Sequence, residues 1–155
     1  MFRELRKKNR ELTKEDSIKI LKSCDYGILS CLSENGYAYG VPLSYVYMNN
    51  SIYFHSATEG HKIDSINNNN KISFCVVGKT HILPEKFSTE YESVIVFGLA
   101  TEVHDNEKNL VLLELINKYS PNYIDEGTKY IENLASKTKV IKITIENISA
   151  KGRKS

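Results

Sequence analysis

The chain has 155 residues, of which 41% are hydrophobic and 26% are charged, and its formal net charge is +2. These values are typical of one globular domain, and so small a net charge does not indicate a polyanionic partner such as a nucleic acid. No apolar run approaches the roughly 20 residues of a membrane-spanning helix, and the basic first residues lack the apolar stretch of a secretory signal. We therefore expect a single domain over residues 1–155, with no membrane contact and a cytoplasmic location.

The first half of the chain begins with a predicted helix over residues 13–23, which opens with a capping-box-like sequence. From residue 26 the side chains alternate with a period of two, which predicts a strand. An Asn-Gly pair then favours a tight turn, and a return strand is expected over residues 37–48. Pro42 cannot donate a ladder hydrogen bond, so it indicates an edge, a bulge or a position that faces something other than a strand.

The remaining elements complete a mainly β (α+β) pattern of about six antiparallel strands with peripheral helices, which predicts a small barrel. Residues 78–90 have no regular period and are expected to form a loop. The other expected strands cover residues 51–56, 71–77, 91–103 and 140–145, and the other expected helices follow residue 60 and cover residues 106–119 and 124–135.

The densest group of polar residues is the segment 53–62, Tyr-Phe-His-Ser-Ala-Thr-Glu-Gly-His-Lys, where a strand runs into a helix. The first N–H groups of a helix lack partners, the helix dipole favours an anion there, and Lys62 adds a positive charge. This pattern predicts a phosphate site. On these residues alone, the alternative that Ser56 and Thr58 only cap the helix is equally open.

Four short blocks are spaced along the chain. They are Lys-Asn-Arg-Glu-Leu at 8–12, Gly-Val-Pro-Leu at 40–43, the segment 53–62, and Tyr-Glu-Ser-Val at 91–94 leading to Gly-Leu-Ala at 98–100. In this order they resemble the pyridoxamine 5′-phosphate oxidase-like flavin proteins, most closely the 5-nitroimidazole antibiotic resistance branch. The resemblance implies a six-stranded split β-barrel homodimer, with FMN, or FAD as the alternative, bound at the subunit interface.

The resemblance also implies the roles of individual residues. Val41, Pro42 and Leu43 would contact the flavin ring through their backbone, and Ser93 would help from the strand opposite. His55 would be the reactive side chain, since a histidine at this position acts near the substrate or cofactor in this branch. Its unperturbed pKa near 6.5 would let it change charge at cellular pH. The residues around the phosphate end of the flavin would be His55, Ser56, His61 and Lys62.

Two departures from the family pattern bear on the reaction. The strand that begins with arginine in the oxidase members begins Tyr37-Ala38-Tyr39-Gly40 here, so oxidation of vitamin B6 is not expected. His61 also stands where many relatives have arginine. The leading hypothesis is therefore an FMN-dependent reductase or oxidase of a small molecule, with nitro-aromatic reduction as one candidate reaction.

Other functions remain as alternatives. One is a flavin or haem carrier without turnover, and another is a barrel that binds single-stranded nucleic acid through its strand tyrosines, which the weak net charge disfavours. The four histidines and three cysteines have no metal-ligand spacing, so no metal site is expected. No GxSxG sequence is present, which argues against a serine hydrolase of that type.

Overall fold

A computed structural model describes residues 1–154 and shows an α+β fold with seven strands. The strands are β1 (Gly27–Leu32), β2 (Ala38–Leu43), β3 (Val46–Met48), β4 (Ser51–Ala57), β5 (Lys71–Leu83), β6 (Ser88–Val103) and β7 (Thr138–Arg153). The helices are α1 (Lys14–Ser23), α2 (His61–Asn68), α3 (Asp105–Tyr119) and α4 (Ile124–Leu134), with short 3-10 turns η1 (Lys8–Arg10), η2 (Pro84–Lys86) and η3 (Ala135–Lys137).

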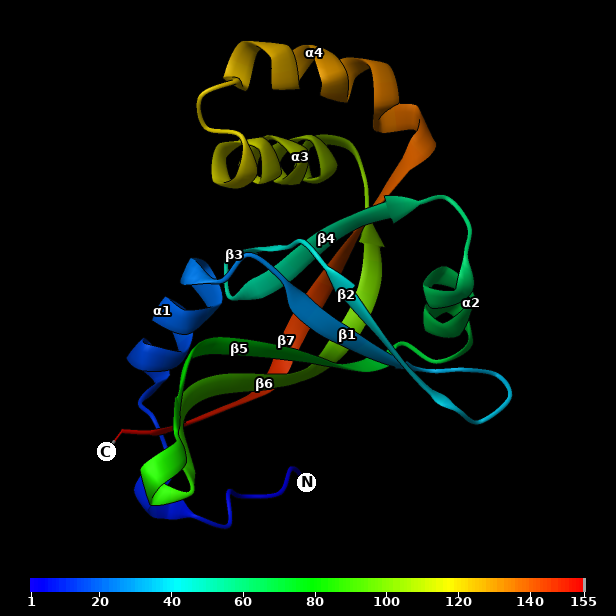
Figure 1. Ribbon diagram of the computed structural model, residues 1–155. Coiled ribbons are helices and arrows are strands. Elements are labelled where there is room, and N and C mark those ends of the chain that lie inside the picture. Colours follow the sequence, from blue (N-terminus) through cyan, green and yellow to red (C-terminus); the bar gives the residue numbers. More distant parts are fainter. Residues whose placement is uncertain (155) are drawn as a thin grey trace.

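All seven strands belong to one antiparallel sheet with the order β2-β1-β5-β6-β7-β4-β3 (Figure 1). Among the described residues no pairing joins the two end strands, β2 and β3, so the sheet is not closed. The mainly β (α+β) class is confirmed, whereas the prediction of six strands is corrected to seven. The extra strand arises because the expected strand over residues 37–48 breaks at Ser44 and Tyr45, and its two halves pair at opposite edges of the sheet.

The expected loop over residues 78–90 is instead the end of a long hairpin. β5 continues to Leu83 and β6 already begins at Ser88, with η2 between them. The register of the two strands shifts between Val77 and Thr80, which marks a bulge. Because a bulge inserts an extra residue, it interrupts the alternation of side chains from which a strand is recognised in a sequence.

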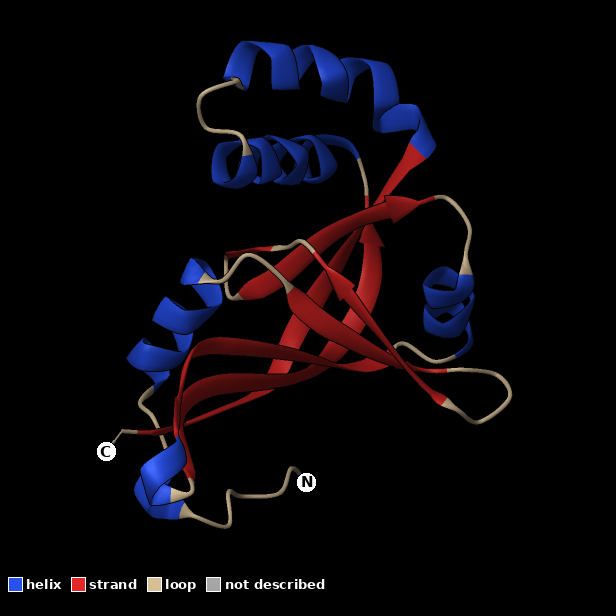
Figure 2. Cartoon of the chain, in the orientation of Figure 1, coloured by secondary structure: helices blue, strands red, loops and turns tan. Residues whose placement is uncertain are grey.

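The helices agree with the sequence-based expectations to within one or two residues. The Thr13 hydroxyl accepts a hydrogen bond from the N–H of Asp16 at 3.0 Å, which is the expected cap of α1. Figure 2 shows α3 and α4 stacked at one end of the sheet, with α1 and α2 on separate sides of it. Within the described residues, no helix has the length and apolar character needed to cross a membrane, and the three cysteines are free thiols.

Two hydrophobic cores hold these layers together. The larger core lies inside the curved sheet and includes Phe54 and Phe74, both fully buried. The smaller core lies between α3 and the strands β3, β4, β6 and β7, and Tyr53 and Val111 are at its centre. Phe54 and Tyr53 are neighbours on β4 and face opposite sides, so this single strand takes part in both cores.

The end of α3 is tied to the break between β2 and β3. The Lys118 ammonium donates hydrogen bonds to the carbonyls of Cys24 at 2.7 Å and Tyr45 at 2.9 Å, and it lies 3.9 Å from the centre of the Tyr45 ring. The Tyr119 hydroxyl donates to the carbonyl of Asp25 at 2.6 Å and accepts from the N–H of Tyr45 at 3.0 Å. Loss of hydration lowers the pKa of Lys118, while the charge of Asp25 opposes this effect.

Replacement of Lys118 should therefore destabilise the whole fold. We expect Lys118→Met to lower the free energy of unfolding by about 2 kcal/mol, because it leaves buried carbonyls without charge-assisted partners. Urea denaturation would measure this loss as a lower midpoint with an unchanged slope. The control is Lys129→Met on the exposed side of α4, which should change stability by less than about 0.5 kcal/mol. Equal effects of the two variants would contradict the assignment.

Candidate functional site

The segment 53–62 forms the end of β4 and the start of α2, as the sequence predicts. Gly60 occupies the N-cap position of α2 with φ 142°, a conformation that favours glycine, and no side chain caps the helix. The Ser56 hydroxyl instead donates to the neighbouring carbonyl of Ala57 at 2.7 Å. Ser56 and Thr58 therefore do not cap this helix, contrary to the alternative reading of the segment. The first N–H groups of α2 are left for a ligand or for water.

Lys62 lies in the first turn of α2 and is half-buried. Its positive charge acts on two neighbours, because it lowers the pKa of His55 and opposes the rise in the pKa of Cys31 that burial causes. Lys62 forms no ion pair with any carboxylate of residues 1–154. The helix dipole and this unpaired ammonium together give the start of α2 a positive potential.

His61 is held by the β1–β2 hairpin. Its ring stacks on Tyr39 with the centroids 3.9 Å apart, and its Nε2 atom is hydrogen-bonded to the Ser33 hydroxyl at 2.9 Å. These contacts bring the start of α2 next to β2, so two predicted parts of the site, residues 41–43 and Lys62, lie on neighbouring elements. The Nε2 atom of His61 is therefore already occupied by the Ser33 hydroxyl of the same chain.

β2 is an edge strand, and β1 is its one neighbour in the sheet. Pro42 is paired with Ile28 of β1. Since proline lacks an N–H, it fits an edge strand where that group would point away from the partner. Val41 and Leu43 pack against the larger core from half-buried positions, whereas Pro42 is exposed. The backbone along the open side of β2 is thus available to a planar ligand.

His55 lies near the end of β4, paired with Val140 of β7. Part of its side chain meets solvent, yet the loss of hydration on the protein side lowers its pKa below the ordinary value of 6.5. The positive charge of Lys62 lowers the pKa of His55 further. The imidazole is therefore neutral at cellular pH and can accept a proton.

Ser93 is not close to these residues within one chain. It pairs with Lys151 of β7, whereas Ser56 pairs with Lys139 of the same strand. The two β7 residues are twelve positions apart, which corresponds to about 40 Å along a strand. The structure thus places residues 55, 56, 61 and 62 at the junction of β4 and α2, which contacts β2 through Tyr39, and places Ser93 far from this junction along the sheet.

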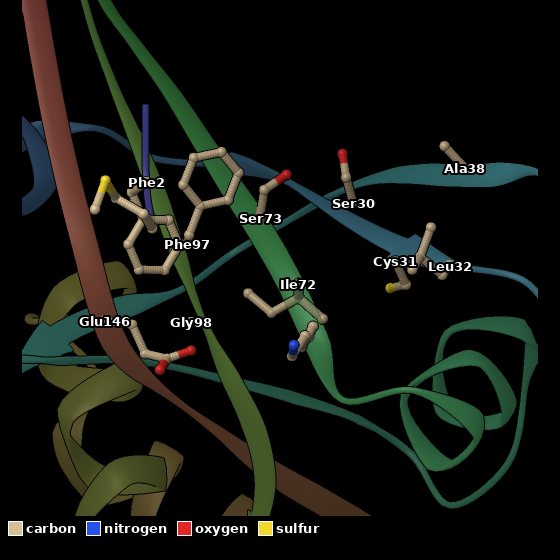
Figure 3. A pocket seen from close by; sticks show the side chains of 12 residues that line it. Phe2, Ser30, Cys31, Leu32, Ala38, Ile72, Ser73, Phe97, Gly98 and Glu146 are labelled. Atoms are coloured by element: carbon tan, nitrogen blue, oxygen red, sulfur yellow. The ribbon is translucent and has the colours of Figure 1, made fainter. Parts of the chain in front are cut away.

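A groove that the sequence reading did not identify lies on the outer face of the sheet. Its volume is about 590 Å³, and β1, β5, β6 and the N-terminal segment contribute side chains to it. Figure 3 shows Phe2 beside Phe97, whose rings are stacked with centroids 5.6 Å apart, and Ser30 next to Ser73 on neighbouring strands. The sequence does contain a signal for this groove. In the middle of β6 the side chains on both faces of the strand are apolar, which indicates a strand that is covered on both sides.

The family described as "Pyridoxamine 5'-phosphate oxidase" matches residues 13–152. The comparison with curated protein sequences finds no match. The superfamily expected from the four sequence blocks is confirmed by the family match.

Several solved structures share the fold. A candidate 5-nitroimidazole antibiotic resistance protein from Bacteroides thetaiotaomicron is 22% identical with a TM-score of 0.75, over 92% of this chain and 86% of that chain. An FAD-binding protein from Mesorhizobium loti is 24% identical with a TM-score of 0.65, over 94% and 98% of the two chains. An FAD and haem binding protein from Mycobacterium smegmatis is 15% identical with a TM-score of 0.83, over 94% and 74%.

The environment of His55 leads to a prediction about its protonation. In an NMR pH titration, the His55 ring should titrate below pH 6.5, because burial and Lys62 both disfavour the charged ring. Lys62→Met should raise the midpoint only in part, since the loss of hydration is the larger cause. Comparison with the His55→Gln variant identifies which ring resonance belongs to His55. A midpoint at or above 6.5 in the unchanged protein would disprove this description.

The same pKa difference makes stability depend on pH. The unfolded chain binds a proton at this histidine near pH 6.5, before the folded chain does, so stability should fall as the pH decreases from about 6.5 to the lower folded pKa. Urea denaturation of the unchanged protein and of His55→Gln at pH 7.5 and 5.0 would measure this contribution. The variant should lose less stability on acidification.

Proposed function

The chain belongs to the pyridoxamine 5′-phosphate oxidase family, and on this basis we propose that it binds a flavin and uses it in a redox reaction of a small molecule. The observation that carries the proposal is the uncapped, positively charged start of α2 beside the open edge of β2. The first feature suits a phosphate group and the second suits a planar ring. FMN is the proposed flavin, and FAD is the alternative because three structural neighbours are described as FAD-binding.

The residues of the site divide the work of binding and chemistry. Lys62, with Ser56 and the first N–H groups of α2, would hold the flavin phosphate by charge-assisted hydrogen bonds. The backbone of residues 41–43 would orient the ring, and His61 would fix α2 against the hairpin through Tyr39. A bound FMN would supply the hydride transfer. His55, neutral at cellular pH, is the proposed proton acceptor near the reacting atoms.

A reductase or oxidase is the leading form of this proposal, and nitro-aromatic compounds are the first substrate class to test. This choice rests on the sequence blocks and on the fold shared with the candidate nitroimidazole resistance protein. The absence of arginine from residues 37–40 argues against vitamin B6 as the substrate. The second candidate is a flavin or haem carrier without turnover, which the fold shared with an FAD and haem binding protein favours. The free thiols fit the proposed cytoplasmic location.

We further propose that two copies of the chain form a homodimer with flavin at the interface. The outer face of β5 and β6 exposes apolar side chains that a monomer has no reason to leave in water: Val77 is 56% exposed, Ile95 37% and Phe97 40%. Ser93 lies on this same face, opposite Val77 in the ladder. Packing of two such faces would allow Ser93 of one copy to approach the flavin site of the other, as the family pattern implies.

The dimer proposal can be tested on Phe97. A charge at this position should prevent burial of the outer face, so Phe97→Glu should convert a dimer into a monomer in analytical ultracentrifugation and weaken FMN binding. Phe87→Glu is the matched control, because Phe87 is 97% exposed in the turn between β5 and β6. A monomeric unchanged protein, or a Phe97→Glu variant that remains dimeric, would rule out this interface.

Flavin binding and turnover are tested in two successive assays. Purified protein should bind FMN with the absorbance of a bound flavin, and anaerobic NADH or NADPH should bleach that flavin if the protein is a reductase. A protein that takes up neither FMN nor FAD excludes both flavin candidates. A flavin that stays oxidised with either donor favours the carrier.

Lys62→Ala tests the phosphate assignment in the same assay. We expect it to weaken FMN binding by about 1 to 3 kcal/mol, as for a lost charge-assisted hydrogen bond. Lys129→Ala on α4 should leave the affinity unchanged. Unchanged affinity in Lys62→Ala would show that the flavin phosphate binds elsewhere.

A further inference from the structure

The N-terminal segment crosses the ends of β6 and β7 and encloses a small hollow. Glu11 forms an isolated bridge with Lys151, and the N–H of Leu12 donates to the carbonyl of Ala150 at 2.9 Å, so the segment is anchored to β7. The hollow has a volume of about 140 Å³. Its lining consists of Leu5, Arg6, Lys7, Arg10, Tyr91 and Lys151.

Four of these six side chains are cations, and none of them is neutralised by the chain. Arg6, Lys7, Arg10 and Lys151 form no ion pair with a carboxylate in the part of the chain that the structure describes. Four like charges around so small a volume repel one another, and they raise the local concentration of anions.

The acidic residues nearby are directed elsewhere. Glu4 pairs with Lys8 at 2.7 Å, and both line a neighbouring hollow together with Arg3 and Glu11. Glu92 follows Tyr91 on β6 and faces the other side of the strand, where it accepts a hydrogen bond from the N–H of Lys79 at 3.2 Å. Opposite charges are thus balanced in one hollow, while the adjacent hollow is lined by positive charge alone.

We propose that this cationic hollow binds a phosphomonoester. Arginine guanidinium groups match two phosphate oxygens at a time, and two arginines with two lysines suit a dianion better than a single carboxylate. Tyr91 supplies an aromatic wall, and the Lys151 ammonium lies 6.0 Å from the centre of its ring. The ring offers a surface for the organic part of the ligand.

The hollow lies far along the sheet from the start of α2. Lys151 pairs with Ser93, and this pair is about 40 Å along β7 from the residue that pairs with Ser56. The inference therefore holds whether or not the proposed flavin site is correct. The phosphomonoester has two potential sources, namely a separate nucleotide or the phosphate of FMN bound to a second copy of the chain.

Calorimetric titration of the purified chain at low ionic strength tests the inference. Inorganic phosphate and 5′-AMP are expected to bind, whereas adenosine, which lacks the phosphate, should not. Arg6→Gln with Arg10→Gln should weaken 5′-AMP binding at least about tenfold, because two charge-assisted contacts are lost. Lys151→Gln at an exposed position should weaken it as well, which tests the site if the double variant is unstable.

The matched control removes two charges from the same segment outside the hollow. Arg3→Gln with Lys8→Gln should leave the affinity for 5′-AMP within about twofold, since screened charges outside the site contribute little. The inference is overturned if no phosphate probe binds, if adenosine binds as tightly as 5′-AMP, or if both double variants lose the same affinity. Displacement of 5′-AMP by FMN would identify the flavin phosphate as the source, and simultaneous binding of both would identify a separate nucleotide.

Discussion

The ammonium of Lys118 and the hydroxyl of Tyr119 hold the chain at the point where it leaves one edge of the sheet for the other. The break at Ser44 and Tyr45 follows directly after Leu43, which pairs with Gly27, the first residue of β1. With this break, β2 remains an edge strand and β3 joins β4 at the opposite edge. The open side of β2, on which the proposed flavin site depends, therefore depends on two side chains at the end of α3.

Charge is distributed over the sheet in two separate positive regions. One is the start of α2, where the helix dipole adds to Lys62 and the neighbouring His55 is kept neutral. The other is the hollow beneath the N-terminal segment, where Arg6 and Arg10 approach Lys151. Since the net charge of the chain is only +2, these regions reflect the placement of charges and not their excess. This explains why composition alone did not indicate an anionic ligand.

The sequence predicted well those features that neighbouring residues determine. The cap at Thr13 and the turn at Gly60 are local, so α1 and the junction between β4 and α2 were located correctly. The break at Ser44 could not be foreseen, because it depends on α3, whose contacts come from more than 70 residues away. The hairpin of β5 and β6 was read as a loop because the bulge between Val77 and Thr80 interrupts its period.

The candidate site was predictable to a similar degree. The junction of β4 and α2 is local in the sequence, but the contacts that join α2 to the β1–β2 hairpin, from His61 to Ser33 and Tyr39, are tertiary. The groove around Phe97 and the cationic hollow combine residues from both ends of the sequence, so no local pattern reveals them. Ser93 is separated from the other motif residues because antiparallel register, and not sequence spacing, decides which residues meet.

The position of β7 has a consequence for biosynthesis. β7 is the last strand in sequence, yet it lies between β6 and β4, and it alone joins β3 and β4 to the other strands in the sheet. During translation, the β3–β4 hairpin cannot join the rest of the sheet until residues 138–153 have been made. Until then, the backbone edge of β4 has no partner strand and the side chain of Phe54 is not buried. Completion of the fold is thus a late, long-range event, and the interval before it is when the nascent chain is most exposed to aggregation.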